Sequence, residues 1–332
     1  MSMITNSLDD IGFYTLTNER VKHANKSSIL YRCELLLTNR CNFKCPYCRD
    51  NDNKTKITLP LGNAINILEY WCKHGLKNLR LSGGEPTLYW NLIDLVVYAK
   101  NRGVERIAIS TNGSASLDYY KRLIDSGVSD LSISLDACCS SFGQEMCGGV
   151  KGAWEKVIEN IYQLSKLTYV TVGMVFTEKN VGQAREAIEF AHNLGVTDIR
   201  VISSAQYNQG IEALRYLPEH ILDKHPILKY RVNNHKLGMV MRGLVQSDTD
   251  RCPLVLDDMA VRDNKHYPCI IYLREGGGAI GDVNNSIRED RYNWYLQHDT
   301  QKDLICSFNC IDVCRAYNNM WIDVNDKEIR CR

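Results

Sequence analysis

The sequence has no excess of charge of either sign and no long hydrophobic run. Its 332 residues include 40 lysines and arginines against 39 aspartates and glutamates, for a net charge of +1. This balance argues against an extended nucleic-acid surface, because polyanion binding needs a surplus of basic residues. No apolar stretch approaches the roughly 18 residues of a membrane-spanning helix, and residues 1–10 are polar. We therefore expect a cytoplasmic protein without a membrane partner.

Cysteine, in contrast, is abundant, with 14 residues. A disulfide framework is not expected in a chain without a secretion signal, since cytosolic thiols stay reduced. Cysteines scattered through a core as small apolar residues are the simplest alternative. Scatter does not explain why three cysteines fall within residues 41–48 and three more within residues 306–314. Such clusters are typical of metal sites.

Between residues 30 and 205, short β-branched or leucine-rich runs alternate with longer segments of helical spacing. We predict strands over residues 33–38, 78–81, 106–110, 130–135, 169–176 and 198–202. Helices are predicted between them over residues 61–74, 91–102, 117–126, 153–166 and 181–194. Alternating strands and helices form parallel sheets, and six units are too few for a closed eight-stranded barrel. The predicted fold is therefore α/β, a partial (β/α)6 TIM-like barrel.

The alternation stops near Tyr207, and the rest of the chain has no clean period. We place a domain boundary near residue 225. It divides the chain into an N-terminal segment (1–29), a core domain (30–225) and a small cysteine-rich α+β domain (226–332).

Cys41, Cys45 and Cys48 fall in a loop directly after the first predicted strand. Ligands bind at the carboxyl ends of parallel strands, and thiolates select iron–sulfur clusters, zinc or copper(I). Structural zinc needs four closed ligands, whereas a cluster on three thiolates leaves one iron open to a bound cofactor. From the spacing alone, zinc remains the alternative.

The arrangement Cys-x3-Cys-x-Tyr-Cys after a first strand resembles the signature of the radical S-adenosylmethionine (SAM) superfamily. The resemblance implies a [4Fe–4S] cluster on Cys41, Cys45 and Cys48, with the methionine part of SAM on its fourth iron. It also implies an external one-electron donor such as a flavodoxin or ferredoxin. The electron cleaves SAM to methionine and a 5′-deoxyadenosyl radical, which abstracts hydrogen from a substrate.

Polar motifs follow the next predicted strands. The glycines of Gly83-Gly84-Glu85-Pro86 let backbone approach a ligand, and Glu85 offers a carboxylate to an ammonium group. Alone, the motif is also an ordinary strand–helix turn, but about 40 residues after the cysteines it resembles the family motif that binds the SAM amino group. The resemblance implies further SAM contacts, with local turn bonding as the alternative for the serines and asparagine. They are Tyr47, Ser110, Asn112 and Ser134.

The C-terminal cysteines resemble a cysteine-rich extension called SPASM when it holds two auxiliary [4Fe–4S] clusters and twitch when it holds one. They are Cys252, Cys269, Cys306, Cys310, Cys314 and Cys331. A full SPASM extension has seven cysteines and a Cys-x2-Cys-x5-Cys block, which this chain lacks. We therefore expect one auxiliary cluster on Cys252, Cys269, Cys310 and Cys314, with Cys306 able to replace Cys310. A structural zinc is the alternative, and the eight histidines show no pairing suited to a metal.

Cys139 and Cys147 follow the fourth predicted strand on the same rim. A thiol there could donate hydrogen to a substrate radical, as in peptide epimerases, and packing is the plainer alternative. We expect oxidation, cross-linking or epimerisation of a peptide or small natural product, because the extension is common in peptide-maturing enzymes. A nucleotide-rearranging enzyme of the molybdopterin-biosynthesis type ranks second, since the Gly-Gly ending of those relatives is absent. A non-catalytic iron–sulfur or zinc module ranks third.

Overall fold

The computed structural model describes residues 16–49, 57–205, 207 and 209–330, so Cys331 lies outside the described part. The six predicted strands are all present, within two residues of the expected ends, and pair in parallel in the order β6-β5-β4-β3-β2-β1. They are β1 (Arg32–Thr38), β2 (Asn78–Gly83), β3 (Arg106–Thr111), β4 (Asp130–Ser134), β5 (Tyr169–Phe176) and β6 (Asp198–Ser203).

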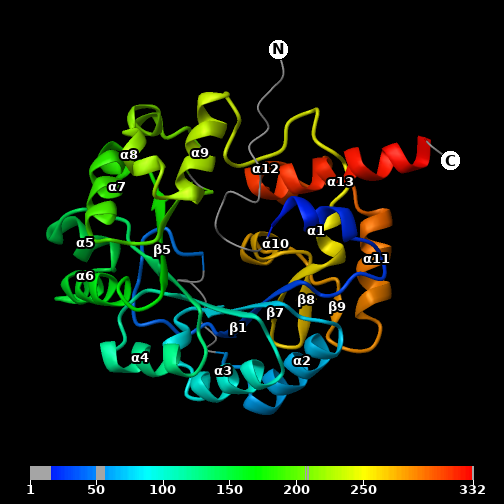
Figure 1. Ribbon diagram of the computed structural model, residues 1–332, viewed down its shortest axis with the longest axis horizontal. Helices are drawn as coiled ribbons and strands as arrows, with labels where there is room; N and C mark the ends of the chain where they lie inside the picture. The colour runs from blue at the N-terminus through cyan, green and yellow to red at the C-terminus, as the bar shows by residue number, and fades with distance from the viewer. Residues whose placement is uncertain (1–15, 50–56, 206, 208, 331–332) are drawn as a thin grey trace.

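The five predicted helices follow these strands and cover the outer face of the curved sheet (Figure 1). They are α2 (Leu61–Lys73), α3 (Leu92–Asn101), α4 (Leu117–Asp125), α6 (Ala153–Leu164) and α7 (Ala184–Asn193). Strand residues alternate between the two faces. On β1, Cys33, Leu35 and Leu37 lie in the main core beneath the helices, so Glu34 faces inward.

The sheet continues beyond β1 with three strands that were not predicted. β7 (Asp258–Arg262) pairs with β1 in parallel, and the short strands β8 (Lys265–Tyr267) and β9 (Gly281–Asp282) follow in antiparallel pairing. Because β6 and β9 end the strand order, the sheet is open, which confirms the partial barrel.

Segments on both sides of residue 225 share this sheet. Helix α9 (Pro226–Lys236) packs on β6, where the backbone N–H of Ile227 donates to the Asp198 carboxylate at 3.1 Å. The domain boundary near residue 225 stays a prediction. The remaining helices are α1 (Asn18–His23), α5 (Ser140–Met146), α8 (Glu219–Leu222), α10 (Ile270–Arg274), α11 (Ile287–Gln297), α12 (Leu304–Asn309) and α13 (Asp312–Arg330).

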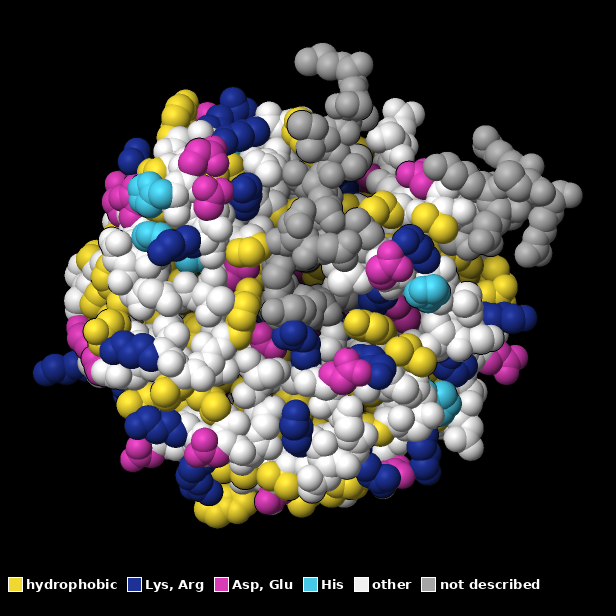
Figure 2. Space-filling view, viewed as in Figure 1, with side chains coloured by type: hydrophobic (Ala, Val, Ile, Leu, Met, Phe, Trp, Pro, Cys, Tyr) yellow, Lys and Arg dark blue, Asp and Glu magenta, His cyan; other side chains and the backbone are white. Residues whose placement is uncertain are grey.

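The C-terminal segments gather beside the open end of the sheet (Figure 1). Helix α1 packs on α13. Arg20 of α1 forms a buried ion pair with Asp257, the residue before β7, with 2.6 Å between Nη2 and Oδ1. On the face shown in Figure 2, basic and acidic side chains are interspersed. None of the described helices has the length and apolar character needed to cross a membrane.

Candidate active site

The loop after β1, residues 39–49 (the cysteine loop), carries the first three cysteines. Cys41 and Cys48 are exposed and Cys45 is half-buried. Two backbone N–H groups make hydrogen bonds within the loop: that of Phe43 donates to Cys41 Sγ at 3.4 Å, and that of Cys48 donates to the Cys45 carbonyl at 3.0 Å. Burial raises the pKa of the Cys41 and Cys45 thiols, and the neighbouring thiols raise it further.

The donor set of the cysteine loop fits an iron–sulfur cluster better than a single zinc ion. A zinc ion with Zn–S bonds of about 2.3 Å would hold its sulfurs roughly 4 Å apart. Among the described residues, the one group of three ligating side chains within 4.8 Å of one another is His298, Asp303 and Cys306. In the cysteine loop, at least one pair of the three sulfurs is therefore farther apart than 4.8 Å, which is too far for one zinc ion. Thiols whose pKa is raised need such a cationic centre to become thiolates.

Gly83 and Gly84 lie directly against the base of the cysteine loop. The N–H of Gly84 donates to the Thr38 carbonyl at 2.6 Å. A Cβ on either glycine would overlap backbone, that of Thr38 for Gly83 and that of Arg40 for Gly84, and Gly83 also has φ of +150°. The glycines thus let the end of β2 clasp the residues that lead into Cys41.

Glu85 is fully buried, and its carboxylate is occupied within the protein. It accepts hydrogen bonds from the N–H and hydroxyl of Thr87, the hydroxyl of Thr111 and the N–H of Asn112, at 2.6–3.0 Å. Burial raises the pKa of this carboxyl. Glu85 therefore joins the ends of β2 and β3, and the contact with a SAM ammonium group stays a prediction.

The other predicted SAM contacts are distributed around the same rim. Asn112 donates to Asn42 Oδ1 at 2.9 Å and lies 3.8 Å from Cys41 Sγ, so it reaches the cysteine loop directly. Ser110 instead accepts from Arg80 at 3.1 Å, on the inner face of the sheet. Ser134 is exposed at the end of β4, and Pro86 is buried at the start of a short 3-10 turn.

Tyr47 is held by a buried carboxylate that we did not predict as a site residue. Its hydroxyl donates to Asp136 Oδ2 at 2.5 Å, and the N–H of Val175 donates to Oδ1 of the same carboxylate at 2.6 Å. Burial raises the pKa of Asp136 to about 6. Asp136 was visible in the sequence at the end of the fourth predicted strand, but nothing there distinguished it from a turn aspartate.

Of the two candidate hydrogen-donor thiols, Cys147 is the one beside the cysteine loop. Its carbonyl accepts from the N–H of Lys44 at 3.4 Å, and its thiol contributes to the raised pKa of Cys45. Burial raises the pKa of the Cys147 thiol to about 11. Cys139 is exposed before α5, where its sulfur lies 3.8 Å from the Ser141 hydroxyl.

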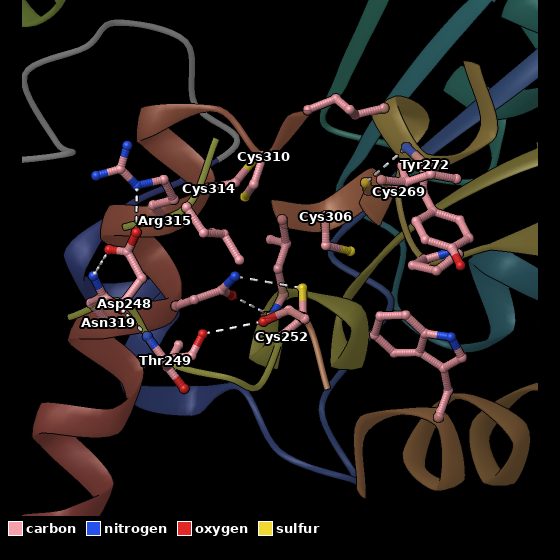
Figure 3. A pocket seen from close by; sticks show the side chains of 18 residues that line it. Asp248, Thr249, Cys252, Cys269, Tyr272, Cys306, Cys310, Cys314, Arg315 and Asn319 are labelled. Atoms are coloured by element: carbon pink, nitrogen blue, oxygen red, sulfur yellow. Dashed lines mark hydrogen bonds and ion pairs between the residues drawn. The ribbon is translucent and has the colours of Figure 1, made fainter. Parts of the chain in front are cut away.

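The five described C-terminal cysteines line a single pocket, with Cys310 and Cys314 on one side and Cys252, Cys269 and Cys306 around the other (Figure 3). Burial raises the pKa of all five thiols, that of Cys252 to about 12. As in the cysteine loop, these cysteines could hold an iron–sulfur cluster. A [4Fe–4S] cluster has four irons, so it would bind four of the five sulfurs.

Cys306 differs from the other four because it also faces a histidine and an aspartate. Its sulfur lies 4.0 Å from His298 Nε2, which is 3.4 Å from Asp303 Oδ2. We did not predict His298 as a member of such a group. Its sequence spacing from Cys306 matches no motif, so only the fold could show this group.

Comparisons with known proteins find one family and several relatives. A model of the radical SAM superfamily matches residues 35–191. The chain is 26% identical over 223 residues to a probable GTP 3′,8-cyclase of Sulfurisphaera tokodaii, covering 61% of this chain and 70% of that one. It is 30% identical over 171 residues to the probable GTP 3′,8-cyclase of Saccharolobus solfataricus, covering 51% and 55%. The matched part thus spans between half and 70% of these relatives.

Structural likeness extends further along the chain. SuiB of Streptococcus suis bound to S-adenosylmethionine superposes with a TM-score of 0.58 at 18% identity, covering 81% of this chain and 64% of SuiB. The anSMEcpe protein with bound AdoMet superposes with a TM-score of 0.61 at 13% identity, covering 91% and 98%. At these identities the likeness concerns the fold, including its C-terminal part.

Proposed function

This chain belongs to the radical SAM superfamily, and from that premise we propose that Cys41, Cys45 and Cys48 hold the [4Fe–4S] cluster at which it cleaves SAM. When bound, the cluster supplies the electron that breaks a carbon–sulfur bond of SAM and yields a radical able to abstract hydrogen. The observation that carries this proposal is the clasp of Gly83 and Gly84 on the residues leading into Cys41.

The surrounding residues position the cysteine loop. Glu85 fixes the ends of β2 and β3, which sets Asn112 against the cysteine loop. The hydrogen bond from Tyr47 to Asp136 holds the far side of the loop on β4. An external one-electron donor, such as a flavodoxin or ferredoxin, would meet the exposed Cys41–Cys48 side.

We propose that the C-terminal pocket holds one auxiliary cluster on Cys252, Cys269, Cys310 and Cys314. Four protein sulfurs leave no iron open, so electron transfer or stabilisation of the local fold is the expected role. Cys306 is left with His298 and Asp303.

For the substrate, a purine nucleotide has more support than the peptide expected first. The curated relatives named above are both probable GTP 3′,8-cyclases, and the matches cover 61% and 51% of this chain. A peptide is the second candidate. It is favoured by the likeness to SuiB, one structure of which is bound to the precursor peptide SuiA and covers 87% of this chain with a TM-score of 0.60.

The proposed chemistry is tested by anaerobic reconstitution with iron and sulfide, followed by dithionite and SAM. We expect 5′-deoxyadenosine from the wild type and from Cys72→Ala, a control on α2, and none above background from Cys45→Ala. Adding GTP or candidate peptides then shows which one yields a new product. A Cys45→Ala protein that still forms 5′-deoxyadenosine would refute the proposal.

A further inference from the structure

The turn between α11 and α12 brings three ligating side chains of different kinds together. His298 ends α11, Asp303 caps the start of α12, and Cys306 lies in the first turn of that helix. A ring nitrogen of His298, a carboxylate oxygen of Asp303 and the sulfur of Cys306 all lie within 4.8 Å of one another. Imidazole, carboxylate and thiolate are the three side-chain groups that bind zinc in proteins.

Both neighbours of His298 approach the same ring nitrogen. His298 Nε2 lies 3.4 Å from Asp303 Oδ2 and 4.0 Å from Cys306 Sγ. A catalytic triad would instead place the carboxylate and the nucleophile on different ring nitrogens. A single hydrogen on Nε2 could point at only one of the two neighbours, whereas a metal ion between the three atoms would bind all of them. The arrangement therefore fits a metal ion better than a proton relay.

The distances are those of a tetrahedral zinc site. Zinc binds nitrogen and oxygen at about 2.0–2.2 Å and thiolate sulfur at about 2.3 Å, which holds neighbouring ligand atoms roughly 3.4–3.6 Å apart. The 3.4 Å between Nε2 and Oδ2 is already of this size, and the 4.0 Å between Nε2 and Sγ is slightly longer. One carboxylate and one thiolate would also balance the two positive charges of the ion.

Neighbouring groups orient these side chains and leave them able to bind an ion. The Tyr272 hydroxyl donates to Asp303 Oδ2 at 3.0 Å, and a carboxylate oxygen has a second lone pair. The N–H of Cys306 donates to the other oxygen, Oδ1, at 2.8 Å. The His298 ring stacks on Trp294 with 4.0 Å between the ring centroids and meets the Tyr272 ring edge-on. Such outer contacts fix the geometry of metal ligands.

Two cations near the turn are directed to other groups. Arg251 donates to the backbone carbonyl of His298 at 3.1 Å, and Lys302 pairs with Asp299 at 2.8 Å. The side chains of His298 and Asp303 are 20% and 17% exposed, so an ion can reach them from solvent.

We propose that His298, Asp303 and Cys306 bind a single zinc ion beside the auxiliary cluster. Three protein ligands leave the fourth position to water. The ion would fix the turn between α11 and α12 at the edge of the pocket that Cys306 and Tyr272 line (Figure 3). This inference rests on the proposed function, because the ligand set proposed there for the auxiliary cluster omits Cys306.

The test uses the full chain, anaerobically reconstituted with iron and sulfide, equilibrated with zinc chloride and desalted. Elemental analysis then gives zinc and iron per chain. We expect the wild type to retain one zinc ion, and His298→Gln and Cys306→Ala to lose it with their iron unchanged. His23→Gln is the matched control, because His23 is exposed on α1 and should leave zinc retention as in the wild type. Tyr272→Phe should weaken zinc binding about tenfold, because it removes the donor to Asp303.

Two further measurements show that a variant has lost the ion rather than its fold. Cobalt(II) in place of zinc should give the visible absorption of a tetrahedral thiolate site in the wild type and not in Cys306→Ala. Zinc should also raise the melting temperature of the wild type and leave that of His298→Gln unchanged.

The inference is overturned if the wild type retains no zinc, or if His298→Gln retains as much as the wild type. It is also overturned if Cys306→Ala loses iron together with zinc, because Cys306 would then be a cluster ligand. Wild-type protein that forms 5′-deoxyadenosine but retains no zinc would refute this inference and leave the proposed function standing. Zinc held through His298 in a protein that forms no 5′-deoxyadenosine would do the reverse.

Discussion

Arg49 and Glu275 form an ion pair with 2.5 Å between Nη2 and Oε2, although 226 positions separate them. Arg49 directly follows Cys48, and Glu275 ends α10, the helix that begins after Cys269. The pair therefore connects the cysteine loop to a segment that carries an auxiliary cysteine. Because the Arg49 side chain is 38% exposed, the pair is expected to add little stability and to act mainly on the placement of the loop.

Glu275→Gln should lower the melting temperature by less than about 3 °C, since an exposed pair is worth under about 1 kcal/mol. It should also speed the loss of iron to a chelator, because the cysteine loop loses an anchor. Glu105→Gln is the control, since it breaks the exposed Lys77–Glu105 pair of equal length away from the loop. Equal iron-release rates in both variants would contradict this role.

Gly84→Ala should destabilise the protein by about 1–3 kcal/mol, because the added methyl would overlap the Arg40 backbone. Thermal melting measures the change, and 5′-deoxyadenosine formation should fall with it as the cysteine loop shifts. Gly182→Ala is the matched control, since a Cβ there meets nothing within 4 Å. A Gly84→Ala protein as stable as this control would rule out the clasp.

Glu85→Gln should lower the free energy of unfolding by about 2–4 kcal/mol. Thr87, Thr111 and Asn112 all donate to the carboxylate, and the NH2 group of glutamine cannot accept their hydrogen bonds. Unfolding in denaturant gives the difference. Glu105→Gln again serves as the exposed comparison. If both substitutions changed stability equally, the carboxylate would have no such connecting role.

The auxiliary cysteines should differ in how much iron they retain. Cys314→Ala and Cys310→Ala should each lose about four irons per chain, whereas Cys306→Ala should keep them, because its sulfur faces His298 and Asp303. Iron analysis after reconstitution makes the comparison. If Cys306→Ala lost iron while Cys310→Ala kept it, Cys306 rather than Cys310 would be the cluster ligand.

His225 should make the protein less stable in acid. This residue is 1% exposed, and its Nε2 lies 2.9 Å from His192 Nδ1. Burial lowers the pKa of His225 to about 4. The unfolded chain, with a histidine pKa near 6.5, therefore binds the proton first, and stability falls as pH drops from about 6.5 toward 4. At pH 5 the loss reaches up to about 2 kcal/mol. Melting at pH 7.5 and 5 should show a smaller difference in His225→Gln, and an unchanged one in the exposed control His23→Gln.

Local patterns predicted the core of the fold well because β1 to β6 and their helices are long and periodic. Strands β8 and β9 have three and two residues, which is too short to show the alternation of a strand in the sequence. β7 alternates Asp258 and Arg262 with core residues, but its parallel partner lies more than 220 residues away, which no local pattern can indicate.

The candidate site was predictable where its chemistry depends on spacing, as in Cys41, Cys45 and Cys48. It was not predictable where contacts join distant segments. Glu85 was expected to face a ligand, and only the fold shows that Thr111 occupies its carboxylate. The same holds for Asp136 beneath Tyr47.

The pairing of β7 with β1 has a consequence for any attempt to divide this protein. A version ending before β7 would leave the backbone N–H and C=O groups along one side of β1 without hydrogen-bond partners. Such an exposed edge strand promotes aggregation with other chains. We therefore expect neither part to fold well on its own. Exchanging the cysteine-rich part with that of a relative would succeed only if the replacement includes a strand that pairs with β1.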